Sequence, residues 1–89
     1  MAENVIVTRK ITVYGVTWCG DCRRARTVLD QSGIEYDWID IDRDHQAEQF
    51  VKQTNGGMRS VPTIIFPDGS ILVEPANYEL SHKLASIPA

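Results

Sequence analysis

Two cysteines three positions apart are the residues of this sequence best suited to chemistry. Cys19 and Cys22 are the only cysteines among 89 residues. A pair at this spacing forms a redox-active dithiol, supplies half of a zinc or iron–sulfur site, or fills a core as two small apolar residues. Zinc takes four ligands, and the chain adds only His45 and His82, without a second Cys-x-x-Cys. The pattern favours redox chemistry, and we assign no metal ligands.

The residues around the cysteines predict a strand followed by a helix. The run at 10–14 is largely apolar, as in a short strand. After the cysteines, Ala25, Val28 and Leu29 recur at helical spacing. We therefore expect a helix over residues 19–32, with the cysteines where the strand hands over to it.

This placement gives the two thiols different roles. Cys19 would lie at the helix N-terminus, where unpaired backbone N–H groups and the helix dipole stabilise a thiolate. Cys22, one turn further in, would be more shielded and close enough to attack a mixed disulfide on Cys19. Gly20 leaves room for a partner's sulfur and backbone to approach. We predict Cys19 as the nucleophile and Cys22 as the resolving thiol.

The rest of the chain predicts three more strands and two more helices. Residues 34–41 are rich in β-branched and aromatic side chains, which is typical of a strand. The turn residues at 67–70 indicate a hairpin. We expect a helix with Ala47, Phe50, Val51 and Thr54 on its apolar face, strands at 64–66 and 71–73, and a last helix opened by Pro75 and Asn77 with Leu80, Leu84 and Ile87 buried.

The resulting element order is βαβαββα, an α/β fold. Two strands joined by a helix imply a parallel pair, and the hairpin adds antiparallel strands, so we expect a mixed four-stranded sheet between helices. The chain length is that of one small domain, residues 1–89, with residues 1–9 as a candidate N-terminal extension.

This order, with Cys-x-x-Cys at the first strand–helix junction and Val61-Pro62-Thr63 before the third strand, resembles the thioredoxin-like three-layer sandwich of the redoxins, and the glutaredoxin branch most. The stretch from Gly56 to Thr63 reads Gly-Gly-x-Arg-x-Val-Pro-Thr. Together with Trp-Cys-Gly-x-Cys, it is most similar to the mycoredoxin group, whose bacteria use mycothiol as their small thiol.

The resemblance implies further site residues. Val61-Pro62 would be a cis peptide bond facing the cysteines, with the Val61 backbone pairing with a bound thiol or peptide. Arg59 would bind a carboxylate of a small thiol or a peptide, the alternative being a solvated loop residue. Trp18, beside the nucleophile, would form part of the substrate-binding surface, together with Gly20.

The sequence differs from thioredoxins and from glutathione-using glutaredoxins at positions typical of those two groups. Thioredoxins carry a buried carboxylate where this chain has Val13, and they tend to have proline at the position of Asp21. Glutathione-using glutaredoxins have a Gly-Gly and an Asp in the stretch that here reads Val73-Glu74-Pro75-Ala76-Asn77-Tyr78. We therefore expect an incomplete glutathione site.

Composition restricts the partners. The net charge of −3 offers no basic face for nucleic acid. We see neither a membrane-length apolar segment nor an export signal at the N-terminus, and two cysteines are too few for a secreted disulfide scaffold. We expect a cytoplasmic monomer without a membrane partner.

The sequence thus predicts a thiol–disulfide oxidoreductase that acts on protein disulfides or on mixed disulfides of proteins with small thiols. It would need no tightly bound cofactor. Mycothiol or glutathione would be its co-substrate, or thioredoxin reductase its electron donor. Two alternatives stay open: an iron–sulfur or metal carrier of the glutaredoxin type, and a thioredoxin-reductase-fed redoxin that donates electrons to ribonucleotide reductase.

Overall fold

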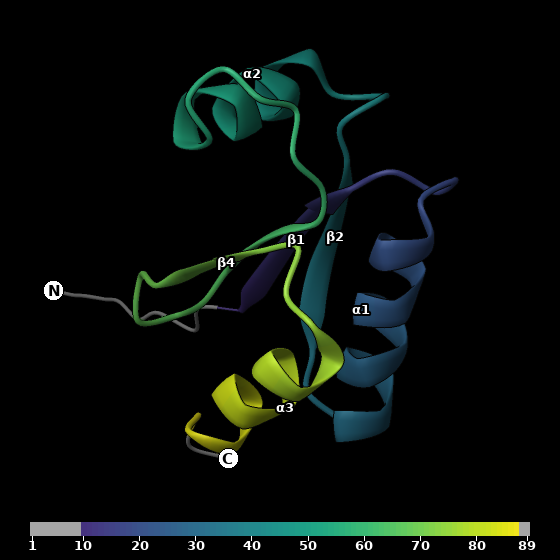
Figure 1. Cartoon of the computed structure of the whole chain (residues 1–89), viewed down its shortest axis with the longest axis vertical. Coiled ribbons are helices and arrows are strands. Elements are labelled where there is room, and N and C mark those ends of the chain that lie inside the picture. The colour runs from purple at the N-terminus through teal and green to yellow at the C-terminus, as the bar shows by residue number, and fades with distance from the viewer. Residues whose placement is uncertain (1–9, 88–89) are drawn as a thin grey trace, which may run out of the picture.

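The computed structural model describes residues 10–87 as one sheet with helices on both of its faces (Figure 1). The N-terminal extension predicted at residues 1–9 lies outside the described residues. The elements are β1 Ile11–Gly15, α1 Gly20–Ser32, β2 Tyr36–Asp40, α2 His45–Thr54, β3 Thr63–Ile65, β4 Ile71–Val73 and α3 Asn77–Ala85. This confirms the predicted order βαβαββα.

The sheet has the strand order β2-β1-β3-β4. Strand β1 pairs in parallel with β2, with Val13 opposite Trp38, and antiparallel with β3, with Val13 opposite Ile64. Strand β4 pairs antiparallel with β3. The sheet is mixed and four-stranded, as the sequence predicts, and β1 is the inner strand that leads directly to the cysteines.

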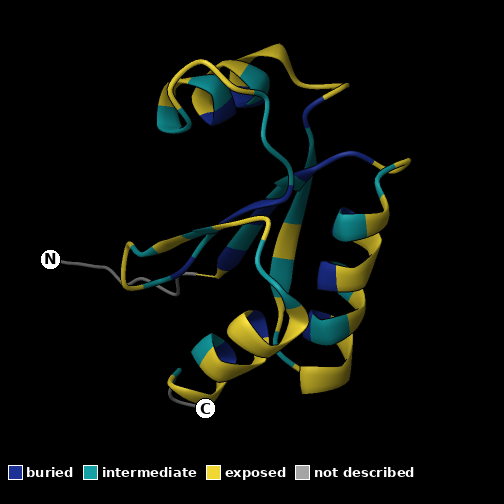
Figure 2. Cartoon of the chain, viewed as in Figure 1, coloured by how far each residue is buried: buried dark blue, intermediate teal, exposed yellow. Residues whose placement is uncertain are grey.

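Alternation along β1 divides the interior into two clusters, one on each face of the sheet. The first lies under α1 and α3 and contains Ile11, Val13, Ala25, Leu29, Ile64, Phe66, Leu80 and Leu84. The second lies under α2 and contains Val16, Ile41, Ala47 and Val51, with Tyr14 and Ile39 packed against it. Figure 2 shows buried residues on the inner sides of α1 and α3 and exposed residues outside. These layers confirm the predicted three-layer sandwich.

Local signals explain where the helices begin and end. Gly33 ends α1 with φ 71°, the left-handed conformation that glycine adopts without strain. Asp44 caps α2 by accepting a hydrogen bond from the Ala47 backbone N–H at 3.0 Å. Phe50 differs from its predicted place: it is 38 % exposed, and its ring lies 5.0 Å from that of Tyr14 near the rim of the second cluster.

Strand boundaries differ slightly from the predicted ones. Strand β2 begins at Tyr36 rather than at residue 34, and β3 spans Thr63–Ile65 rather than 64–66. Strand β2 begins later because Tyr36 lies opposite Ile11, the first residue of β1. Within residues 10–87, no helix is long and apolar enough to cross a membrane.

Candidate active site

Cys19 is the N-cap residue of α1. Its backbone is extended, with φ −96° and ψ 125°, and its carbonyl accepts the first helical hydrogen bond, from the Arg23 N–H at 3.1 Å. Its side chain caps no backbone N–H and is partly exposed. The helix begins one residue later than predicted, at Gly20. Cys19 therefore lies at the N-terminus of α1, with its side chain partly open to a partner.

Cys22 has the opposite environment. Its side chain is fully buried beneath the first turn of α1. Burial, opposed by a hydrogen bond with the Val16 backbone and reinforced by the neighbouring Cys19, raises the pKa of the Cys22 thiol to about 12. The two thiols predicted as nucleophile and resolving group thus differ in accessibility as the sequence suggests.

Gly15 makes room for Cys22, a requirement that the sequence reasoning missed. A Cβ added at Gly15 would stand 2.8 Å from the Cys22 sulfur and 2.6 Å from Cη2 of Trp38. Both contacts are shorter than van der Waals distance, so only glycine fits here. The available signal was a glycine at the end of the strand that precedes Cys-x-x-Cys.

The loop before β3 forms the other side of the site. The Val61-Pro62 peptide bond is cis, as the resemblance implies. Val61 and Cys19 both pack against the cluster under α2, so the loop and the nucleophile border the same cluster. Pro62 is buried, and its carbonyl accepts a hydrogen bond from the Glu74 N–H at 2.9 Å. Within residues 10–87, no hydrogen bond occupies the Val61 backbone.

A buried hydroxyl anchors this loop to α2. Thr63 is fully buried, and its Oγ1 donates to the Ser60 carbonyl at 2.8 Å. The same oxygen accepts a hydrogen bond from Asn55 Nδ2 at 3.1 Å. Asn55 is the C-cap of α2 and also donates to the Val51 carbonyl at 2.8 Å. The proline loop is therefore fastened to the end of a helix.

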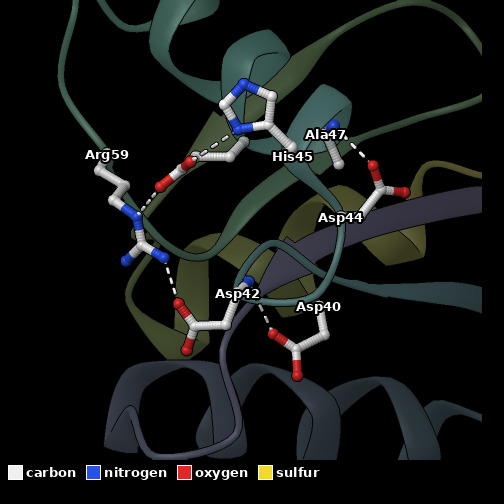
Figure 3. Close-up of polar contacts among 7 residues, drawn as sticks. Asp40, Asp42, Asp44, His45, Ala47 and Arg59 are labelled. Carbon is white, nitrogen blue, oxygen red and sulfur yellow. Dashed lines mark hydrogen bonds and ion pairs between the residues drawn. The ribbon is translucent and has the colours of Figure 1, made fainter.

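Arg59 and Trp18 meet at the loop between β2 and α2. The Arg59 guanidinium pairs with Glu48 at 2.5 Å and with Asp42 (Figure 3). Trp18 is 67 % exposed, and its Nε1–H donates to Asp42 Oδ2 at 2.8 Å. The guanidinium is thus paired with carboxylates of the protein itself, and its binding of a substrate carboxylate stays a prediction. The sequence reasoning missed Asp42 and Glu48.

Hydrogen bonds to these carboxylates favour their charged forms. The hydrogen bonds from Trp18 and then Arg59 lower the pKa of Asp42, and the one from Arg59 lowers the pKa of Glu48. In return, the two carboxylates raise the pKa of the Arg59 guanidinium above its already high ordinary value. All three groups are therefore ionised at neutral pH.

The three arginines of α1 have different partners and do not form one cationic face for an anionic partner. Arg23 donates to the Thr17 carbonyl at 3.3 Å, and Arg24 pairs with Asp21 at 2.6 Å. The guanidinium of Arg26 lies 4.2 Å from the centre of the Trp38 ring. Beside Gly20, a groove of about 390 Å³ runs along this helix towards Asn77 at the start of α3.

The histidines lie apart from the cysteines. His45 is an exposed residue at the start of α2, with Nδ1 3.6 Å from Glu48, and His82 is exposed on α3. Among the residues that the structure describes, no three His, Cys, Asp or Glu side chains gather as a set able to hold a metal ion.

Solved structures with the same fold include proteins of the redoxin class. The NrdH-redoxin of Escherichia coli, whose structure is titled as that of a glutaredoxin-like protein with a thioredoxin-like activity profile, superposes with a TM-score of 0.74, covering 91 % of this chain and 99 % of its own, at 21 % identity. The thioredoxin-like protein BC3987, in a T8A mutant, gives a TM-score of 0.73 over 86 % of this chain and all of its own, at 23 % identity. These similarities show a thioredoxin-like fold.

Sequence comparisons are more specific. The glutaredoxin family model matches residues 11–71. A Mycobacterium tuberculosis protein named "Putative glutaredoxin" is 43 % identical over 92 % of this chain and 98 % of its own. Mycoredoxin 1 of Corynebacterium glutamicum is 39 % identical over 86 % of this chain and 95 % of its own. The family match spans the strand, the cysteine pair and the cis-proline loop. The chain therefore belongs to the glutaredoxin family and is a thiol–disulfide oxidoreductase.

Proposed function

We propose that this protein reduces mixed disulfides between proteins and a small thiol, and protein disulfides, with Cys19 as its nucleophile. The observation that carries the proposal is the contrast between the two thiols. Cys19 is partly exposed at a helix N-terminus, whereas Cys22 is fully buried one turn below. Only the first can meet a partner's sulfur without a change in the fold.

The first step is a thiol–disulfide exchange. The Cys19 thiolate attacks one sulfur of the substrate disulfide, the S–S bond of the substrate breaks, and a new disulfide forms between Cys19 and that sulfur. The other sulfur leaves as a thiolate and takes a proton from water. Cys19 lies at the N-terminus of α1, the end of a helix at which negative charge is favoured.

Two routes complete the cycle. In the first, Cys19 retains the small thiol, and a second small thiol attacks it, which regenerates the Cys19 thiolate and releases the small-thiol disulfide. In the second, Cys22 gives its proton to water and attacks the Cys19 sulfur, which leaves a Cys19–Cys22 disulfide and releases the partner as a thiolate that takes a proton from water. A two-electron donor must then reduce that disulfide.

Substrate binding is assigned to the surface around Cys19. The unoccupied backbone groups of Val61 supply a donor and an acceptor for an extended thiol or peptide, since Val61 and Cys19 pack on one cluster. The exposed ring of Trp18 adds apolar contact, and Gly20 opens into the groove beside α1. Pro62 keeps the Val61 peptide group in place, and Arg59 acts through its ion pairs with Asp42 and Glu48.

Mycothiol is our first choice of small thiol, and glutathione the second. The support is the 39 % identity to Mycoredoxin 1 over most of both chains. Where a glutathione site would need its Gly-Gly and Asp, the chain carries Val73 to Tyr78. A redoxin fed by thioredoxin reductase is the alternative, and its support is a shared fold at 21 % identity. We assign the protein to the cytoplasm, where thiols are kept reduced. We assign it as a monomer, because one chain supplies both Cys19 and Val61.

The test compares three electron donors on the oxidised protein: mycothiol, glutathione, and thioredoxin reductase with NADPH. We expect fast reduction by mycothiol and slow reduction by the other two. Fast reduction by thioredoxin reductase alone would replace this proposal with the reductase-fed redoxin. Absorption between 320 and 450 nm of protein purified without oxygen tests the iron–sulfur carrier in the same preparation.

A further inference from the structure

The carboxylate of Asp42 joins two loops that flank the nucleophile. Its Oδ2 accepts the indole N–H of Trp18 at 2.8 Å. Its Oδ1 accepts a hydrogen bond from Nη2 of Arg59, the contact drawn in Figure 3. Trp18 directly precedes Cys19, and Arg59 stands two residues before Val61. The two partners are separated from Asp42 by 24 and 17 residues in the sequence, so the contact links distant segments.

Asp42 is itself held in place. Its backbone N–H donates to Asp40 Oδ1 at 2.9 Å, which fixes the turn that follows β2 (Figure 3). Arg59 is held at a second point, because its Nε donates to Glu48 of α2 at 2.5 Å. Helix α2 begins three residues after Asp42, at His45, with Asp44 as its cap. The carboxylate is thus a fixed point to which both loops are attached.

The exposure of Trp18 gives this contact its importance. Because 67 % of the surface of Trp18 is exposed, few packing contacts restrict the orientation of its indole ring. A hydrogen bond to a charged acceptor is stronger than one between neutral groups. The bond to Asp42 is therefore the main restraint on the ring that borders Cys19.

We propose that Asp42 is a positioning residue: by binding Trp18 and Arg59 with its two oxygens, it sets the separation of the Cys19 loop and the Val61-Pro62 loop and so arranges the surface that the substrate disulfide meets. The inference rests on the proposed function of Cys19. It gives Arg59 a role other than capturing a substrate carboxylate, because its guanidinium already neutralises charge on Asp42 and Glu48.

The first measurement is structural and independent of activity. Indole N–H signals in ¹H–¹⁵N spectra report on Trp18 and Trp38, and the variant Trp18→Phe assigns them. In Asp42→Ala the Trp18 signal should shift and its hydrogen exchange should accelerate, while the Trp38 signal stays. Asp42→Asn, which keeps an acceptor oxygen, should retain the Trp18 signal. An unchanged Trp18 signal in Asp42→Ala would overturn the proposal.

The second measurement separates docking from thiol reactivity. The probe is a synthetic peptide whose single cysteine is disulfide-bonded to 2-mercaptoethanol, mixed with pre-reduced protein in a single turnover. Asp42→Ala should lower the second-order rate constant about fivefold, because it removes the hydrogen bonds that hold Trp18 and Arg59. Alkylation of Cys19 by iodoacetamide should keep its wild-type rate, because the thiolate itself is untouched. Equal losses in both reactions would contradict a positioning role.

A matched control and a double variant complete the design. Asp68→Ala removes an exposed carboxylate that pairs with Lys83 at 2.7 Å at the β3–β4 turn, and it should leave both rates unchanged. If Asp42 acts through Trp18, the variant Trp18→Phe/Asp42→Ala should be less impaired than the product of the two single effects. Purely multiplicative losses would exclude coupling. A wild-type protein that fails to react with the peptide would instead refute the function proposed for Cys19, while the spectra still test the contact.

Discussion

The sulfur of Cys22 lies where Gly15 leaves space for it: a Cβ on Gly15 would stand 2.8 Å from that sulfur. The end of β1 and the first turn of α1 therefore meet at van der Waals distance, with Trp38 of β2 closing the contact from the other side. Cys22 can be fully buried at this junction because Gly15 has no side chain.

Gly15→Ala should therefore destabilise the protein. The added methyl group would overlap both Cys22 and the Trp38 ring, and overpacking of this kind costs about 1–3 kcal/mol. Urea denaturation of the reduced protein measures the loss. Gly20→Ala is the matched control, because a Cβ there meets nothing within 4 Å and should leave the free energy of unfolding nearly unchanged. Equal stability of the two variants would show that the junction tolerates a side chain.

The buried thiol also predicts a pH dependence of stability. Because the pKa of Cys22 is raised to about 12, the folded state keeps its proton where an unfolded thiol, with a pKa of about 8.5, loses it. The unfolded state then binds fewer protons, so stability falls as pH rises from the unfolded value towards the folded one. The slope contributed is at most about 1.4 kcal/mol per pH unit.

Urea titrations of reduced wild type and Cys22→Ser between pH 8 and 11 measure this slope. The pKa of Tyr14 is also raised by burial, which adds a slope of the same sign to both proteins. We expect a steeper decline for the wild type. Parallel curves would mean that Cys22 ionises as readily in the folded as in the unfolded chain.

Removing the buried hydroxyl of the proline loop should loosen that loop. Thr63→Val leaves Asn55 Nδ2 without its 3.1 Å acceptor and frees the Ser60 carbonyl, a change that costs about 1–3 kcal/mol. Thr27→Val is the control, since the Thr27 hydroxyl donates to a helix carbonyl at an exposed site. We expect the first variant alone to lower the thermal midpoint by several degrees. A midpoint equal to that of the control would contradict the anchoring role.

The parts of the fold and site that the sequence predicts are those encoded locally. The strand–helix junction at Cys19 and the helix predicted over residues 19–32 each depend on neighbouring residues, and the structure has them within one residue of the expected positions. The cis bond before Pro62 came from the resemblance to a family, since most X–Pro bonds are trans.

What the sequence did not reveal is long-range pairing. Trp18, Asp42 and Arg59 are joined only after β1, β2 and the proline loop are side by side, and no spacing rule relates such distant residues. The same is true of Gly15, whose need to lack a side chain comes from Trp38 on another strand. Phe50 fits a helical apolar stripe, yet α2 is short and its rim position leaves the ring partly exposed.

The central claim is that Cys19 carries the exchange, and trapping its intermediate tests this most directly. Reduced Cys22→Ser and Cys19→Ser are each mixed with a protein–mycothiol mixed disulfide, and the products are mapped by mass spectrometry. We predict a disulfide-linked adduct on Cys19 in the first variant and no adduct in the second. An adduct on Cys22 in the Cys19→Ser variant, formed at the rate seen for Cys19, would contradict the account.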